Sequence, residues 1–115
     1  MRRDDERLAD IIEAAEKIRA RVVGGRERFD ADEDLQIVLV HLVQIIGEAA
    51  SCLSDHVTSD HPQVPWRQII AMRNRVVHGY FEVDLDILWY VVTVDVPQLS
   101  EHVSAILAES QHGQN

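Results

Sequence analysis

The residues best suited to chemistry lie in one short stretch, residues 71–84, which reads AMRNRVVHGYFEVD. It contains Arg73, Asn74, His78 and Tyr80. Arginine supplies a permanent forked donor for a phosphate group and for the charge that develops on it. Histidine moves protons near neutral pH, and asparagine can hold a nucleophile or the imidazole by hydrogen bonds. Together these side chains supply what metal-free cleavage of a phosphodiester needs: a proton shuttle, a fixed cation and a polar positioner.

The spacing of these residues indicates how they are brought together. On a helix, at about 100° per residue, Asn74 and His78 share a face, whereas Arg73 lies about 140° round from His78. One helix therefore brings the guanidinium and the imidazole together poorly, which favours a site shared across a dimer. Because Gly79 suits the position after a helix end, we expect His78 to be the last helical residue. The unpaired carbonyls there stabilise imidazolium while Arg73 and Arg75 oppose it, which predicts titration near neutrality.

A plainer interpretation stays open for each of these residues. Arginine and histidine separated by four residues occur in many unrelated helices, as a surface arginine and a helix-capping histidine. Tyr80 alone is more often a packing residue with a solvated hydroxyl. Glu48 either faces the site or caps a neighbouring helix, and Gly47 is expected to permit close helix packing. His41, on an apolar helix, is expected to be a hydrogen-bonded core or interface group.

The remaining polar residues give weaker indications. His56, His61, Asp55 and Asp60 do not repeat a metal-binding spacing, so neither a metal nor another cofactor is expected. Cys52 has no companion base nearby in its helix, which argues against catalysis by its thiol.

Charge is distributed unevenly over the 115 residues. The formal net charge is −9, yet residues 61–81 contain three arginines and no carboxylate, so this window carries +3 and the remainder −12. A cationic window in an acidic chain indicates a local anion site or a partner-facing patch, not a protein that coats nucleic acid along its length. One cysteine excludes an internal disulfide and suits a reducing compartment. No apolar signal segment follows Met1, so we expect a soluble, cytoplasmic protein.

The hydrophobic periodicity predicts four amphipathic helices in a single domain spanning residues 1–115. The first starts near Asp4 and ends at Gly24. After a polar loop (24–34), the second runs over 33–57 and is apolar nearly all round, which places it centrally in a bundle or against a second subunit. The third follows Pro65, and the fourth starts near Asp84 and should kink at Pro97, although residues 91–96 also read as a strand. The expected fold is an all-α, up-and-down antiparallel four-helix bundle with a kinked last helix.

Several weak motifs combine into a more specific pattern that covers essentially the whole chain. They are residues 46–50 (IGEAA), residues 64–66 (VPW), residues 73–80 (RNRVVHGY) and Trp89. This combination resembles the HepT family of HEPN-domain toxins, which are typically encoded beside an MntA-type nucleotidyltransferase antitoxin.

The resemblance implies an HEPN-like helical bundle that forms a homodimer and cleaves RNA without a metal ion. Its R-x4-H-x-Y motif matches Arg73, His78 and Tyr80, with Asn74 in the polar position after the arginine. In the family, the ribose 2′-hydroxyl attacks the adjacent phosphate at a cleft on the dimer interface. The antitoxin adds AMP groups to the tyrosine, and the added charge would repel RNA.

Two further hypotheses stay in view beside this endoribonuclease toxin. The chain could be a non-catalytic helical partner of a nucleotidyltransferase, for which its acidic surface offers complementarity to a basic protein. It could also be a purely structural dimeric bundle in which the arginine and histidine cap helices. RNA is the expected substrate of the toxin, and neither DNA nor a membrane is an expected partner.

Overall fold

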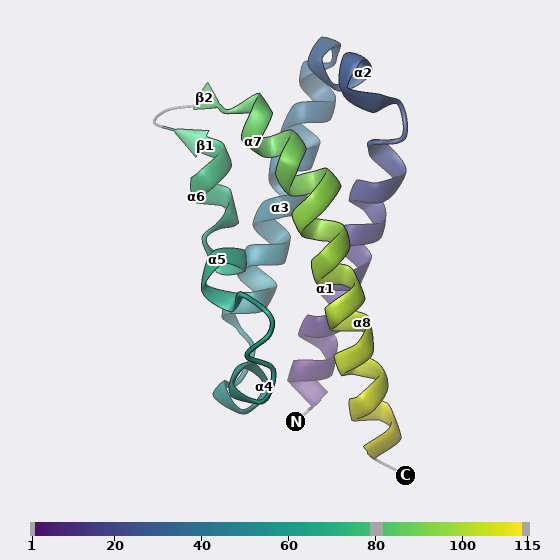
Figure 1. Cartoon of the computed structure of the whole chain (residues 1–115), viewed down its shortest axis with the longest axis vertical. Helices are drawn as coiled ribbons and strands as arrows, with labels where there is room; N and C mark the ends of the chain where they lie inside the picture. The colour runs from purple at the N-terminus through teal and green to yellow at the C-terminus, as the bar shows by residue number, and fades with distance from the viewer. Residues whose placement is uncertain (1, 79–81, 114–115) are drawn as a thin grey trace.

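The computed structural model describes residues 2–78 and 82–113. Within them, four helical segments, called the legs of the bundle, run alternately up and down (Figure 1). The first leg is α1 (Arg2–Arg21) and the second is α3 (Glu33–Ser51). The third consists of α5 (Trp66–Ile70) and α6 (Met72–Val76). The fourth is continuous through α7 (Leu85–Tyr90), η1 (Val91–Asp95) and α8 (Val96–Gly113). The predicted all-α, HEPN-like antiparallel bundle is confirmed.

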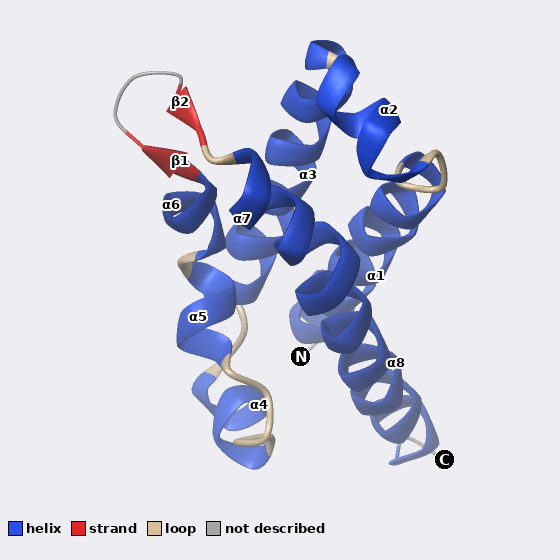
Figure 2. Cartoon of the chain, turned by 45° about the horizontal axis from the view of Figure 1, so that its top comes forward, coloured by secondary structure: helices blue, strands red, loops and turns tan. Residues whose placement is uncertain are grey.

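The connections between the legs carry structure of their own. The predicted polar loop of residues 24–34 is wrong in its main part, because a short helix, α2 (Gly25–Ala31), fills it. Gly25 starts this helix with φ at +82°, a backbone conformation that favours glycine. A two-stranded antiparallel hairpin, β1 (Val77–His78) and β2 (Glu82–Val83), joins α6 to α7 at one end of the bundle (Figure 2).

Helix α2 closes the end of the bundle that carries the hairpin. Phe29 is fully buried, and its ring centroid lies 5.0 Å from that of Trp89 on α7. Arg26 lies over the Phe29 ring, and its guanidinium donates to Asp30 and to Asp86 on α7, both at 2.7 Å. These two hydrogen bonds, the one to Asp30 first, raise the pKa of Arg26. Apolar packing and a shared ion pair therefore hold α2 against α7.

The second leg is shorter than the sequence predicts. Helix α3 ends at Ser51, and a separate helix, α4 (Asp55–Asp60), replaces the expected continuation to Val57. Ser54 starts the separate helix α4, because its hydroxyl accepts a hydrogen bond from the backbone N–H of Val57 at 3.4 Å as an N-cap. The Ser54 backbone N–H and hydroxyl also donate to Asp4 of α1, at 3.0 and 2.7 Å. The break is thus fixed by a contact with a residue fifty positions earlier.

The third leg also ends earlier than expected. Helix α6 stops at Val76, and His78 lies in β1, where it pairs with Glu82 while Val77 pairs with Val83. The prediction that His78 is the last helical residue is therefore wrong. β-branched Val77 and Val83 suit an extended, half-buried pair. The Asp84 N–H donates to the Val76 carbonyl at 2.7 Å and closes the base of the hairpin.

Just before Pro97, where a kink is predicted, the fourth leg contains a π-helical turn, η1. Across η1 the Val96 N–H bonds to the Val91 carbonyl, five residues back. Proline has no N–H to offer the carbonyl of Thr93, and its ring would crowd that oxygen in a regular helix. A wider turn relieves the crowding. The alternative of a strand over residues 91–96 is wrong.

All four legs contribute to one apolar core, and no buried polar side chain occurs among the described residues. Helix α3 is central to it, since it packs against α1 on one side and against α5 and α6 on the other. By length and composition α3 is also the one described helix that could cross a membrane, but 44% of that stretch is buried inside the bundle. The position of α3 in the core of the bundle accounts for its apolar character.

Candidate active site

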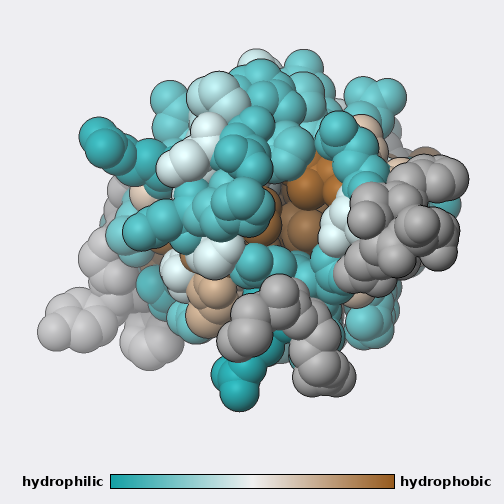
Figure 3. All heavy atoms as spheres, turned by 90° about the horizontal axis from the view of Figure 1, so that it is seen from below, coloured by the Kyte–Doolittle hydropathy of each residue, from teal (hydrophilic) through white to brown (hydrophobic). Residues whose placement is uncertain are grey.

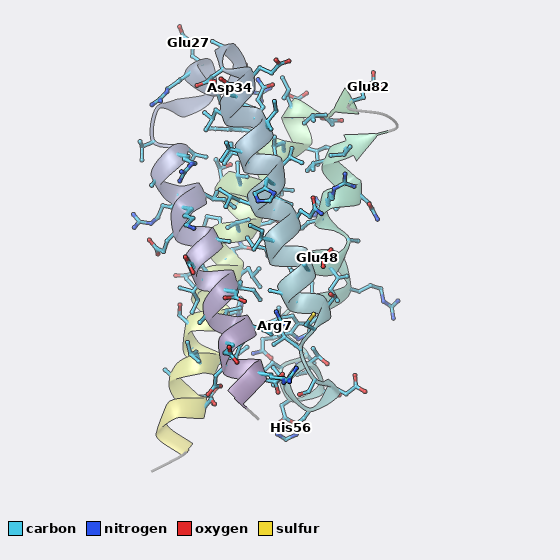
Figure 4. The ribbon with its side chains drawn as sticks, turned by 180° about the vertical axis from the view of Figure 1, so that it is seen from behind. Arg7, Glu27, Asp34, Glu48, His56 and Glu82 are labelled. Carbon is cyan, nitrogen blue, oxygen red and sulfur yellow. The ribbon has the colours of Figure 1, made fainter. Side chains whose placement is uncertain are left out.

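Arg73 and Asn74 lie at the border of a hollow of about 270 Å³ between α3 and the α5–α6 segment. Helix α3 contributes Gln44, Glu48 and Ser51 to its lining. Figure 4 views this side of the molecule and shows Glu48 on the outward face of α3, next to α5. Of the two interpretations of Glu48, the structure supports the one in which it faces the site.

Gly47 brings the two walls of this hollow together. A Cβ atom at this position would lie 3.1 Å from the carbonyl oxygen of Ile70 and 3.5 Å from that of Ile69. The first distance is shorter than an ordinary contact, so a larger residue would push the α5 backbone away from α3. The expectation that Gly47 permits close helix packing is confirmed.

The side chains of Arg73 and Asn74 make no hydrogen bond or ion pair with any of residues 2–78 or 82–113, and both are exposed. Arg75, two positions along the same helix, differs because its guanidinium bonds to Asp95 at 3.2 Å. Residues two apart on a helix face opposite sides, so α6 turns Arg73 toward the hollow and Arg75 away from it. Arg73 is therefore available to bind an external anion.

His78 does not lie on the helix where the sequence predicts it. Because the chain leaves the helix after Val76, the shared helix face of Asn74 and His78 and the 140° offset from Arg73 do not hold. The backbone of His78 lies two residues beyond α6, at the end of the bundle that carries the hairpin, and its side chain is outside the described part of the structure. Tyr80 lies outside the described residues altogether.

The hollow belongs to a wider outward face of α3. Its residues recur at spacings of four, three and four: Ile37, His41, Gln44 and Glu48, all exposed. The core interpretation of His41 is therefore wrong, and the interface interpretation stays a prediction. Ile37 is 59% exposed and Ile70, at the edge of the hollow, is 44% exposed. Polar and large apolar side chains thus share this face, a mixture typical of an interaction surface.

Sequence reasoning missed Gln44, Ser51 and Ile70 as lining residues. Polar side chains at positions 41, 44, 48 and 51 form one stripe on a helix that is otherwise strongly apolar. A stripe of this kind, which interrupts an all-apolar helix on one face only, is the signal that could have identified them.

A second kind of hollow lies at the opposite end of the bundle, where α4 and both termini gather. Figure 3 shows it as a hydrophobic recess framed by hydrophilic residues. Its volume is about 580 Å³, and its lining combines apolar residues of α1, α4 and α8 with Asp4, Asp60 and Glu109. The exposed His56 imidazole lies 3.5 Å from the Asp60 carboxylate there. This recess is remote from Arg73.

Comparison with known proteins places this architecture in a family. The model of the ribonuclease HepT-like family matches residues 11–106. A protein of Thermococcus cleftensis named probable ribonuclease HepT is 34% identical over 94 residues, covering 82% of this chain and 84% of that protein. A candidate RNase of Caldanaerobacter subterraneus is 33% identical over 105 residues, covering 90% of this chain and 94% of that protein. No solved structure matches the chain.

The fold and the family match together define an all-α, HEPN-like ribonuclease. The chain belongs to the ribonuclease HepT-like family.

Proposed function

We propose that this chain is a metal-independent endoribonuclease that acts as the toxin of a toxin–antitoxin pair in the cytoplasm. The observation that carries the proposal is an exposed Arg73, without a partner among the described residues, next to Asn74 at a hollow on the outward face of α3. An unpaired guanidinium in a chain of net charge −9 is a natural site for a phosphate. The names of the family and of its relatives support RNA as the phosphodiester that is cleaved.

The proposed site is completed by a second copy of the chain. Ile37 and Ile70 are large apolar residues left exposed on the same face as Arg73, and a partner copy would remove them from water. A two-fold dimer joins the same patch on both subunits, so two outward faces of α3 would meet. Each subunit would then present its own Arg73, Asn74 and His78 to a cleft shared between them.

In the proposed reaction the ribose 2′-oxygen attacks the adjacent phosphorus and the bond from phosphorus to the 5′-oxygen breaks. The 2′-hydroxyl loses its proton to a base, and the leaving 5′-oxygen gains one. The products are a 2′,3′-cyclic phosphate and a free 5′-hydroxyl, and no water is consumed. His78 would transfer or orient these protons, Arg73 would stabilise the phosphorane charge, and Asn74 would position the reacting groups.

The test measures cleavage of end-labelled RNA in EDTA by the wild type, His78→Ala, Arg73→Ala and Arg67→Ala. Arg67→Ala is the matched control, because Arg67 is an exposed arginine of the same cationic window that does not line the hollow. We expect the first two variants to lose activity by at least about 100-fold, as expected for loss of an acid–base group or of a positioned electrostatic donor. The control should stay near wild type. Equal cleavage by wild type and His78→Ala, or cleavage that requires Mg²⁺, would overturn the proposal.

Regulation of this activity is proposed to act on Tyr80. An MntA-type nucleotidyltransferase would transfer AMP from ATP to the tyrosine hydroxyl and release pyrophosphate. Each AMP adds negative charge two residues from His78, which would repel RNA. Co-expression with the adjacent gene and intact-mass measurement should show gains of whole adenylyl units that disappear in Tyr80→Phe. Tyr90→Phe is the control, since Tyr90 is 53% exposed on α7; adenylylation that persists in Tyr80→Phe would refute the assignment.

A second candidate function is non-catalytic binding of a nucleotidyltransferase. The acidic recess formed by α1, α4 and α8 favours it, because an apolar floor with a carboxylate rim suits a basic, partly apolar segment of a partner. The two functions differ in their effect on cells. Growth arrest on expression of this chain alone, abolished by His78→Ala, supports the toxin, and harmless expression supports the binding module.

A further inference from the structure

A third hollow lies on the other side of α6 from Arg73, between the α5–α6 segment and the η1–α8 segment. Its volume is about 290 Å³, near the lower end of the range of roughly 300–1,000 Å³ that small-molecule pockets occupy. Its floor is apolar, formed by buried Val64, Ile69 and Leu99. Its polar lining consists of Gln63, Gln68, Gln98, Arg75, Asp95 and His102. This hollow shares no residue with the one that Arg73 lines.

The π-helical turn contributes directly to this pocket. Asp95 is the last residue of η1, its side chain is 23% exposed, and it accepts a hydrogen bond from Arg75 at 3.2 Å. The ion pair holds the Arg75 guanidinium in one orientation on the pocket wall. A π turn inside an α-helix is frequently found at a functional site, and here it places the carboxylate that fixes the arginine.

The balance of charge argues for an uncharged ligand. Arg75 is already paired with Asp95, and no other arginine or lysine lines the pocket. A phosphate would therefore find no unpaired arginine or lysine there. Three exposed glutamines offer both amide donors and carbonyl acceptors, and a guanidinium plane is a surface on which a nucleobase stacks. These groups match the flat face and the hydrogen-bonding edge of a nucleobase.

We infer that this pocket binds the base of a nucleotide that neighbours the cleaved phosphodiester, an inference that rests on the proposed ribonuclease function. Arg73 and Arg75 lie on opposite sides of α6, one at each hollow. A helix with its side chains is only about 10 Å across, so an RNA strand that crosses α6 connects the two. The scissile phosphate lies at Arg73, and the neighbouring base stacks on Arg75 with its edge toward Gln68 and Gln98.

The binding test uses the four uncharged ribonucleosides, with ribose 5-phosphate as the control ligand, and follows two-dimensional NMR spectra of the ¹⁵N-labelled protein. We expect at least one nucleoside to shift the side-chain amide signals of Gln68 and Gln98, and ribose 5-phosphate to leave them unchanged. Gln68→Leu and Gln98→Leu should each weaken this binding about tenfold, the effect of one or two lost hydrogen bonds. Gln44→Leu, in the hollow that Arg73 lines, should leave nucleoside binding unchanged. Absence of shifts with all four nucleosides, or equal binding by Gln98→Leu, overturns the inference.

A second arm connects the pocket to cleavage. Gln98→Leu should raise KM for RNA about tenfold and leave kcat within about twofold, because it removes ground-state binding only. Arg73→Ala should lower kcat. An unchanged KM in Gln98→Leu overturns the inference while the ribonuclease function stands. If the wild type cleaves no RNA at all, the proposed function fails, and the nucleoside titration still decides whether the pocket binds a base.

Discussion

Replacing Gly47 by alanine tests how closely α3 and α5 must approach to form the Arg73 hollow. Two opposing effects set the change in the free energy of unfolding. Alanine in a helix interior is favoured over glycine by about 1 kcal/mol. Against this, the new methyl group would lie 3.1 Å from the Ile70 carbonyl oxygen, and overpacking of a well-packed contact costs about 1–3 kcal/mol. A backbone carbonyl cannot rotate aside as a flexible side chain can. The cost of overpacking should therefore exceed the gain in helix propensity.

The expected net result is a loss of about 1 kcal/mol in the free energy of unfolding, within a range of 0 to about 2. Urea denaturation followed by circular dichroism measures it. Gly24→Ala is the comparison, because the three atoms nearest to a Cβ there all belong to the Arg28 side chain and none is a backbone carbonyl. Cleavage by Gly47→Ala should fall even where the protein is fully folded, because the displaced α5–α6 segment carries Arg73. A Gly47→Ala variant that is more stable than wild type by about 1 kcal/mol and fully active would refute this reasoning.

Three further outcomes are expected. Ser54→Ala removes the cap of α4 and the hydrogen bond to Asp4, and should lower the free energy of unfolding by about 1 kcal/mol in urea denaturation; no change would mean that the break after α3 does not depend on this cap. Phe29→Ala empties a fully buried site against Trp89 and should lower the free energy of unfolding by about 3–5 kcal/mol in the same denaturation experiment. A loss below about 1 kcal/mol would contradict tight packing of α2. Ile37→Glu should shift the proposed dimer to monomer in sedimentation without lowering the stability of the subunit, because Ile37 is 59% exposed in the single chain. An unchanged dimer would place the interface elsewhere.

The four legs could be predicted from the sequence because each carries a long, regular apolar stripe. Leu8, Ile11, Ala15 and Ile18 of α1, for example, recur at helical spacing and are all buried. An irregularity close to Pro97 was also predictable, because proline removes a specific hydrogen bond at a known place, and the π-helical turn lies directly before it. These features depend only on neighbouring residues.

The ends of the elements depend on contacts that local pattern does not reveal. Ser54 ends the second leg because it is also held by Asp4, far away in the sequence. His78 joins a strand because the chain returns to pair it with Glu82. The site reflects the same division. The arginine and asparagine were identifiable from residue type, and the polar stripe that includes Gln44 and Ser51 is visible in the sequence of another leg. Only the packing shows that this stripe lies beside Arg73.

The central claim is that guanidinium and imidazole groups from two copies of the chain act on one phosphodiester. Mixing separately inactive Arg73→Ala and His78→Ala proteins, after exchange of subunits, tests it most directly. Random exchange of equal amounts makes half of the dimers mixed. If Arg73 of one subunit works with His78 of the other, each mixed dimer holds one intact site out of two. Activity then returns to about a quarter of wild type. If activity stays at the level of the separate variants although mixed dimers have formed, the site does not span two subunits and the account is wrong.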